Sequence, residues 1–338
     1  MKPAYRWLLD LTHLPTTSGS EGRVIEWVTR WVDRRTDLRL RTDRAGNLLL
    51  TIKGRKRRSP VIAAAHMDHP GWVVEEVDGK LVRARFMGGV LPAYFDSAAV
   101  VFYSSSGDEI RGVVESYGDK LASIRMAARG VDVGDIGRWW FDKRSLGVKH
   151  DLLRAPACDD LAGVAASLAA LDKARKKAHL NHFGVLLTRG EEEGLLGAIA
   201  ACELGTIPAG SRLLSIETSR SFPDSPIGGG PVVRVGDRSS IFDAQLSNQL
   251  TDAVRAAGIA HQRKLMAGGT CEATAFSAYG HRATGLCLPL GNYHNMVDID
   301  GVAAGTTGGV LAPEEISLAD VDVLGDLSRV SASDVDDP

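Results

Sequence analysis

Residues 182–204 read HFGVLLTRGEEEGLLGAIAACEL and contain the clearest indication of the architecture. The apolar run His182–Thr188 has the length of a buried strand, and Leu195–Leu204 has the composition of a helix. The glycine-bounded carboxylates Gly190-Glu-Glu-Glu-Gly194 stand between them. A buried strand that turns directly into a helix is the repeating unit of α/β folds. The stretch therefore predicts an α/β domain with an acidic strand-to-helix corner.

The same alternation of strand and helix patterns continues on both sides of this corner. Apolar stripes at helical spacing cover Leu161–Leu171 and Ile241–Ala257. Together these patterns predict a central mixed sheet flanked by helices. The predicted strands are Asn47–Ile52, Val61–His66, Arg212–Thr218 and Ala283–Leu290.

Two local patterns near the N-terminus predict a helix start and a turn. Ser18-Gly-Ser-Glu21 has the form of a capping box and precedes apolar residues at helical spacing, so a helix is expected to begin near Ser18. The basic run Lys53–Arg58 lies between two predicted strands, and its expected role is a solvated turn rather than a nucleic-acid patch.

Residues 71–150 have a different sequence pattern from the rest of the chain. Short alternating segments such as Leu81–Phe86 and Ile110–Val114 predict strands, and no amphipathic helix of useful length is visible there. This region is predicted to be a small, barrel-like all-β domain inserted into the larger one. The larger α/β domain would then comprise residues 1–70 and 151–332, with a disordered acidic tail at 333–338.

The composition excludes several classes of protein. Hydrophobic residues make up 44% and charged residues 24%, which is typical of a soluble globular protein. The formal net charge of −2 gives no global field that would favour nucleic acid or an anionic membrane. No apolar stretch approaches the length of a membrane span, and the four scattered cysteines form no disulfide pattern. We expect a cytoplasmic protein with no nucleic-acid or membrane partner.

Side chains that can bind metal recur in five short segments, four of them at predicted strand ends. Each has an ordinary structural explanation on its own, such as a helix cap or a loop histidine. In combination they supply nitrogen and oxygen ligands of the kind that two divalent ions would share. At the acidic corner, one carboxylate could bind metal while its neighbour acts as a general base. The segments contain His66 with Asp68, Asp159, Glu191 with Glu192, Glu217, and His294.

In this order the chain resembles the co-catalytic dinuclear metallopeptidases, most closely the M42 family of glutamyl and tetrahedral aminopeptidases. The strongest local match is Glu191–Ala198, which is close to the family's Glu-Glu-x-Gly-Leu-x-Gly-Ala signature. Ser18-Gly-x-Glu21, Asp43-x-x-Gly-Asn47 and the inserted β-module extend the resemblance over nearly the whole chain. It implies a zinc-exopeptidase-like fold, two divalent ions (zinc, with cobalt or manganese as alternatives) and homo-oligomeric assembly.

The resemblance also implies a role for each candidate. His66 and Glu217 would bind one ion, Glu192 and His294 the other, and Asp159 both. Glu191 would be the general base, and Asp68 would support the His66 ring.

Three positions depart from the family pattern, and they concern substrate choice. The family's aminopeptidases generally have Asp where this chain has Glu217. The usual Asp-Glu after the first His-Met is Asp68-His69 here, where His69 is expected to be structural. Gly-Gly-Thr-Asp is replaced by Gly268-Gly-Thr-Cys271.

The expected function is removal of N-terminal residues from short peptides, with Glu191 activating a water between the ions. Because Glu217 is more familiar in related carboxypeptidases and acyl-amino-acid hydrolases, those activities on a small amide substrate stay open. A non-catalytic metal-binding relative is a further alternative. A serine hydrolase is disfavoured because the chain has no Gly-x-Ser-x-Gly elbow.

Overall fold

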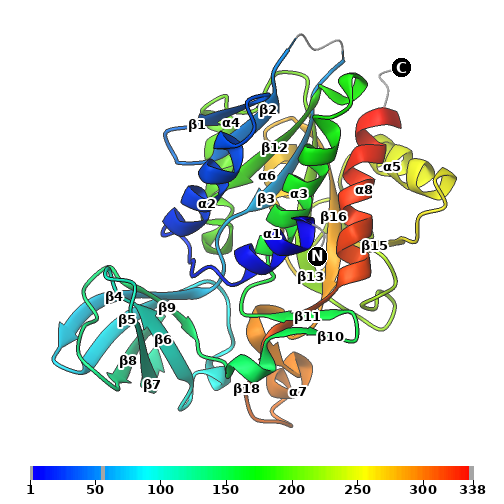
Figure 1. Cartoon of the computed structure of the whole chain (residues 1–338). Helices are drawn as coiled ribbons and strands as arrows, with labels where there is room; N and C mark the ends of the chain where they lie inside the picture. The colour runs from blue at the N-terminus through cyan, green and yellow to red at the C-terminus, as the bar shows by residue number, and fades with distance from the viewer. Residues whose placement is uncertain (1–2, 55–57, 335–338) are drawn as a thin grey trace.

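An eight-stranded mixed sheet forms the centre of the molecule (Figure 1). The structure, a computed structural model, describes residues 3–54 and 58–334. The four central strands run parallel, and the sheet becomes antiparallel on either side of them. In spatial order the strands are β1 (Leu38–Thr42), β2 (Leu48–Ile52), β12 (Phe183–Thr188), β3 (Val61–His66), β13 (Arg212–Arg220), β16 (Arg282–Leu290), β14 (Val232–Asp237) and β15 (Gln262–Met266).

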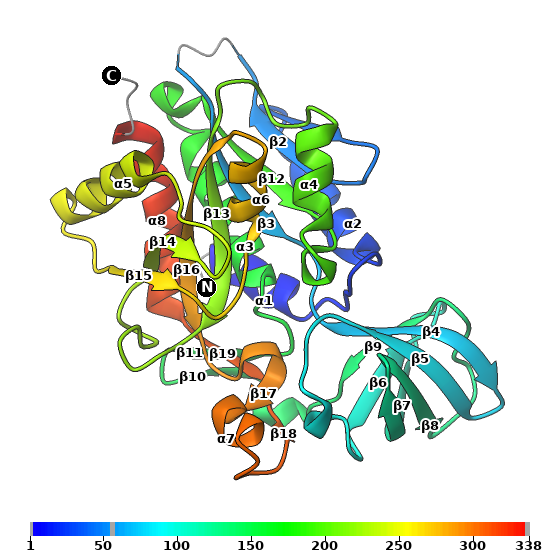
Figure 2. The ribbon, with the colours of Figure 1, turned by 180° about the vertical axis from the view of Figure 1, so that it is seen from behind.

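Helices cover both faces of this sheet, and β3 shows why. Every residue of β3 is buried, and alternate residues belong to different cores: Ala63 packs with one helix layer and Ala64 with the other. In Figure 1 α3 and α8 lie in front of the sheet, and Figure 2 shows α4 and α6 on the opposite face. The first layer contains α1 (Pro3–Thr12), α2 (Gly22–Asp33), α3 (Leu161–Ala174), α5 (Ala244–Ala256) and α8 (Leu318–Asp334); the second contains α4 (Leu196–Glu203) and α6 (Glu272–Ala278).

A closed six-stranded barrel stands beside the sheet domain (Figures 1 and 2). Its interior is aromatic: Trp72 packs edge-on against Phe86, Phe95 and Trp139, with ring centroids 4.7–5.5 Å apart. Trp139 is therefore a core residue of the barrel. The strands are, in order around the barrel, β4 (Gly71–Asp78), β5 (Leu81–Met87), β8 (Leu121–Met126), β7 (Glu109–Gly118), β6 (Ala99–Tyr103) and β9 (Ile136–Trp139).

Two small antiparallel sheets lie outside the main sheet and the barrel. One is the three-stranded sheet β10–β11–β19, and the other is the two-stranded sheet β17–β18, whose strands are separated in the chain by α7 (Ile299–Ala303). The strands are β10 (Gly147–Lys149), β11 (Leu152–Ala155), β19 (Glu314–Ser317), β17 (Met296–Val297) and β18 (Val310–Leu311), and the 3₁₀ turns are η1 (Pro92–Tyr94), η2 (Lys143–Ser145), η3 (Ala178–Leu180), η4 (Glu191–Glu193) and η5 (Tyr293–Asn295).

The predicted α/β architecture and barrel-like module are confirmed, but one helix start is wrong. Helix α2 begins at Gly22, and Ser18 does not cap it. Residues 55–57 of the predicted basic turn and 335–338 of the predicted tail lie outside the described residues. Within the described part of the chain, no helix is both long and apolar enough to cross a membrane.

Candidate metal centre

The carboxyl ends of the parallel strands bring the predicted site residues together. His66 ends β3, Glu217 lies near the end of β13, and the glutamate corner η4 follows β12 directly. His294 lies in η5, after β16, and Asp159 precedes α3. Parallel strands place their carboxyl ends at one edge of the sheet, where α/β proteins bind ligands.

Asp159 lies between the two histidines. Its Oδ1 is 3.4 Å from His66 Nε2, and its Oδ2 is 3.4 Å from His294 Nε2. Glu217 Oε2 lies 3.9 Å from His66 Nε2, and Glu192 Oε1 lies 3.0 Å from His294 Nε2. One carboxylate thus faces two separate sets of ligand atoms.

The hydrogen bonds of the two histidines direct one nitrogen of each toward the carboxylates. His294 Nδ1 lies 2.7 Å from the carbonyl oxygen of Gly89, and His66 Nδ1 lies 3.2 Å from the carbonyl oxygen of Asp68. A carbonyl only accepts, so Nδ1 is the donor and Nε2 of each neutral ring presents a lone pair. In the neutral form that binds metal, His294 Nε2 is an acceptor that faces a second acceptor, Glu192 Oε1, at 3.0 Å. A cation between them would satisfy both, as in metal sites where histidine binds a backbone carbonyl with its other nitrogen.

The donor atoms are close enough to share ions. The ligand atoms of His66, Asp159 and Glu217 lie within 4.8 Å of one another, and so do those of Asp159, Glu192 and His294. A third possible grouping joins His66, Glu191 and Glu192. Mixed nitrogen and oxygen ligands suit zinc, cobalt or manganese, so the acidic and histidine groups found here can bind metal.

Burial and neighbouring charges strongly shift the pKa values of the carboxyl and imidazole groups of this centre. Burial raises the pKa of Glu191 well above its ordinary value; His66 opposes the rise, and the charges of Glu217 and Glu192 add to it. For His66, burial lowers the pKa, but Glu191, Asp159 and Asp68 together raise it well above its usual range. The centre therefore contains more negative charge than its own side chains neutralise.

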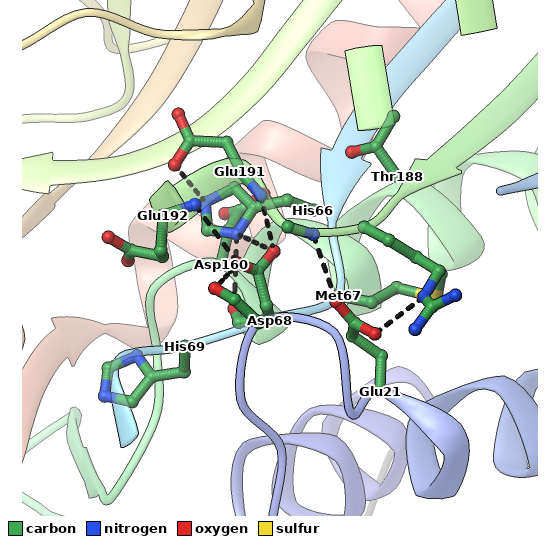
Figure 3. A network of polar contacts seen from close by, with 12 residues as sticks. Glu21, His66, Met67, Asp68, His69, Asp160, Thr188, Glu191 and Glu192 are labelled. Carbon is green, nitrogen blue, oxygen red and sulfur yellow. Dashed lines mark hydrogen bonds and ion pairs between the residues drawn. The ribbon is translucent and has the colours of Figure 1, made fainter. Parts of the chain in front are cut away.

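Asp68 connects the first histidine to the glutamate corner (Figure 3). Its Oδ1 lies 3.4 Å from His66 Nδ1 and accepts a hydrogen bond from the Glu191 N–H at 3.0 Å. Its Oδ2 accepts from the Glu192 N–H at 3.1 Å and from the Ser18 hydroxyl at 2.5 Å. Asp68 thus orients the His66 ring and fixes the backbone that carries both glutamates.

The Ser18–Glu21 motif serves this corner instead of capping a helix. Buried Glu21 accepts hydrogen bonds from the N–H of Gly190 at 3.0 Å and from Arg189 Nε at 2.6 Å (Figure 3). The Ser18 hydroxyl donates to Asp68. Ser18 and Glu21 therefore both contact residues that adjoin the candidate ligands. The capping-box prediction is wrong because the partners lie far away in sequence, where local spacing carries no information.

Buried Glu314 is a site residue that sequence reasoning missed. Its Oε2 accepts the N–H groups of Cys158 and Asp159 at 2.6 and 3.0 Å, and its Oε1 accepts the N–H of His294 at 2.9 Å. One carboxyl group therefore ties together the backbones of two candidate ligands. No spacing pattern around Glu314 indicates this role.

His69 is structural, as expected from its position beside Pro70. It is buried, with Nδ1 2.6 Å from the carbonyl oxygen of Asp159 and Nε2 3.3 Å from the Asn295 side-chain oxygen. These two contacts connect His69 to the loops that contain Asp159 and His294.

The Glu314→Gln variant is expected to lose about 2–4 kcal/mol of unfolding free energy, because one of the two buried oxygens that accept backbone N–H groups is replaced by an amide NH₂ group, which can only donate. Chemical denaturation of the metal-free protein measures this loss. The matched control is Glu315→Gln, whose side chain pairs with Arg154 and is 23% exposed, and which should cost under about 1 kcal/mol. Equal losses in the two variants would contradict the role assigned to Glu314.

Comparison of sequence and of structure with known proteins identifies similarity to peptidases. A family model described as M42 glutamyl aminopeptidase matches residues 46–123 and 119–307. A protein of Acetivibrio thermocellus named "Putative aminopeptidase" is 26% identical over 86% of this chain and 92% of its own length. An aminopeptidase from Desulfurococcus kamchatkensis has a similar structure, with TM-score 0.79, 23% identity and coverage of 98% and 96% of the two chains. The TET1 peptidase of Pyrococcus horikoshii, which assembles into a tetrahedron or an octahedral shell, matches with TM-score 0.79, 21% identity and coverage of 97% and 99%.

Proposed function

The chain belongs to the M42 glutamyl aminopeptidase family and is a peptide-bond hydrolase of exopeptidase type, and from this premise we propose that it is a dinuclear metal-dependent aminopeptidase acting on short peptides. The observation that carries the proposal is the position of Asp159, whose two carboxylate oxygens face different histidines. His66 and Glu217 would hold one ion, Glu192 and His294 the other, and Asp159 both.

Two divalent ions would polarise the scissile carbonyl and lower the pKa of the attacking water. The chain's own residues would transfer the protons and hold the reacting groups in position. Glu191 is not needed as a ligand in either Asp159-centred set, so its carboxylate is free to take a proton from the water and deliver it to the leaving amine. Asp68 keeps His66 and the Glu191 backbone in place during this exchange.

The domain organisation and assembly are part of the proposal. Residues 1–70 and 151–332 would form the catalytic domain, with 71–150 inserted between them. A homo-oligomer is proposed from the assemblies of the structurally similar TET1 peptidase, and a location in the cytoplasm from the four scattered cysteines, which form no disulfide pattern. Zinc is the proposed metal, with cobalt and manganese as alternatives that the same donors accept.

A chelated and then metal-reloaded enzyme tests the proposed reaction. We expect metal-dependent release of the N-terminal residue from unblocked peptides, and no hydrolysis of N-acyl amino acids. Cleavage restricted to blocked substrates would favour the carboxypeptidase or deacylase activity that Glu217 keeps open. Metal binding without any turnover would favour a non-catalytic relative.

Stabilisation by zinc is expected to increase with pH. Burial raises the pKa of Glu217 from its ordinary 4.5 to about 7, although the charges of His66 and Arg234 oppose the rise. A carboxyl group whose pKa is raised on folding stabilises the metal-free protein at low pH, and this contribution is lost as pH rises through about 7. Metal binding requires the ionised carboxylate. The rise in Tm on adding zinc should therefore be larger at about pH 8 than at about pH 5.5; a rise independent of pH would contradict Glu217 as a ligand.

A further inference from the structure

The two oxygens of the Glu217 carboxylate have different surroundings. Within the described part of the chain, this carboxylate accepts one hydrogen bond, which the Ser215 hydroxyl donates to Oε1 at 3.3 Å. The other oxygen, Oε2, lies 3.9 Å from Nε2 of His66, with which Glu217 would share an ion. One oxygen is therefore held by the protein, and the other is left for the metal centre.

The regular geometry of β13 explains the contact between Ser215 and Glu217. These residues are two positions apart on the strand, so their side chains point to the same face of the sheet. On the neighbouring strands, Ser215 pairs with Ala64 of β3 and with Gly285 of β16. Neither residue has a polar side chain, so neither competes with Glu217 for the Ser215 hydroxyl.

The burial of Ser215 makes this hydrogen bond important. Ser215 is fully buried, and Glu217 is only 5% exposed. Among the described residues, the Ser215 hydroxyl has no hydrogen-bond acceptor other than Glu217 Oε1. A buried hydroxyl without an acceptor is unfavourable, because its hydrogen bonds to water are lost and not replaced. Ser215 therefore stabilises the conformation of Glu217 in which Oε1 stays beside it.

Ser215 lies outside the cavity that adjoins the candidate metal centre. This cavity has a volume of about 500 Å³, and His66, Asp159 and Glu217 line one side of it. Ser219, two residues beyond Glu217 on β13, also lines the cavity, but Ser215 is not among the described residues that do. Ser215 could therefore influence a bound ion only through Glu217.

A carboxylate can bind a metal ion through one oxygen or through both. If both oxygens of Glu217 bound the ion, Oε1 would have to turn away from Ser215, and the buried hydroxyl would lose its acceptor. Catalytic zinc sites typically have three protein ligands and keep a further position for water or substrate. His66, Asp159 and Glu217 supply three such ligands with one atom each. A second oxygen from Glu217 would compete for the remaining position.

We propose that Ser215 is a positioning residue, which holds Glu217 as a one-oxygen ligand and so keeps a coordination position of that ion open. The inference rests on the proposed function, because it takes His66, Asp159 and Glu217 as the ligands of one ion. Ser215 itself contacts neither the ion nor the substrate. It acts in the same way as the outer groups that orient ligands by hydrogen bonds in other metal sites.

Cobalt(II) is a suitable probe of this role. It accepts the same nitrogen and oxygen ligands as zinc, and its visible absorption becomes weaker as the number of ligands around it increases. Metal-free wild-type protein and the Ser215→Ala variant would each be titrated with cobalt(II) in the absence of substrate. Because binding is measured without turnover, the result does not depend on catalysis. Wild-type protein that binds two cobalt ions but hydrolyses no peptide would count against the proposed function separately.

In Ser215→Ala, one of the two cobalt ions is expected to lose absorption intensity, because Glu217 Oε1 is released and can join Oε2 on the ion. Ser215→Thr keeps the hydroxyl group and should retain the wild-type spectrum. An unchanged spectrum in Ser215→Ala overturns the proposal. The same loss of intensity in Ser215→Thr also overturns it, because the hydroxyl would then not be the cause.

Two controls separate this role from structural damage. Glu217→Ala removes the ligand through which Ser215 acts, so adding Ser215→Ala to it should not change the cobalt spectrum further. An equal change in both backgrounds overturns the proposal. Ser247→Ala removes another buried hydroxyl, which bonds to Thr284 and to the carbonyl oxygen of Asp243, and it should leave the spectrum unchanged. A loss of intensity in Ser247→Ala equal to that in Ser215→Ala would likewise overturn the proposal.

Discussion

The Glu191→Gln variant is expected to retain two metal ions and to lose about 10³-fold or more in kcat, because glutamine preserves the shape of the side chain but cannot accept a proton. Glu191 is held at the site by its own N–H, which donates to Asp68 Oδ1, and its Oε2 lies 3.9 Å from His66 Nε2. Neither Asp159-centred ligand set requires its carboxylate. Metal analysis and steady-state kinetics on an unblocked peptide measure the two quantities separately.

The neighbouring Glu193 provides the matched control. Its carboxylate accepts a hydrogen bond from the Gly88 N–H and pairs with Lys120 at 2.9 Å, so it faces the barrel rather than the metal centre. Glu193→Gln should therefore keep kcat within about tenfold of wild type. Near-normal turnover in Glu191→Gln, or an equal loss in both variants, would remove Glu191 from the role of general base.

The Asp159→Asn variant should bind at most one ion in place of two, and kcat/KM should fall by about 10³-fold or more. An amide offers one acceptor oxygen, so it cannot face His66 and His294 with equivalent negative atoms as Asp159 does. Metal analysis after gel filtration measures the stoichiometry. Circular dichroism confirms that the variant is folded.

Asp160→Asn is the control for the bridging role. Burial raises the pKa of Asp160 well above its usual range, which favours the neutral carboxyl form that an amide resembles. Its Oδ1 accepts from the Thr218 hydroxyl at 3.0 Å, which an amide oxygen can also do. This variant should retain two ions. Full metal content in Asp159→Asn would contradict the assignment of Asp159 as the shared ligand.

Local patterns in the sequence predicted the central strands of the sheet domain. Fully buried strands such as Val61–His66 and Phe183–Thr188 are continuous apolar runs, because parallel strands covered on both faces have no polar side. The candidate ligands follow those strands, so strand order along the chain already indicated that they converge. Two strands at one edge, β14 and β15, have mixed patterns that do not predict them.

The sequence by itself determined the α/β architecture, the barrel-like insertion and the set of candidate ligands, because burial periodicity and strand ends are local properties of the chain. Only the tertiary structure decided what surrounds the ligands. Ser18 donates a hydrogen bond to Asp68, and Glu314 accepts one from the Asp159 N–H. These features depend on which buried polar groups meet across 50 to more than 150 residues, and a buried group's partner is fixed by packing in space rather than by spacing along the chain.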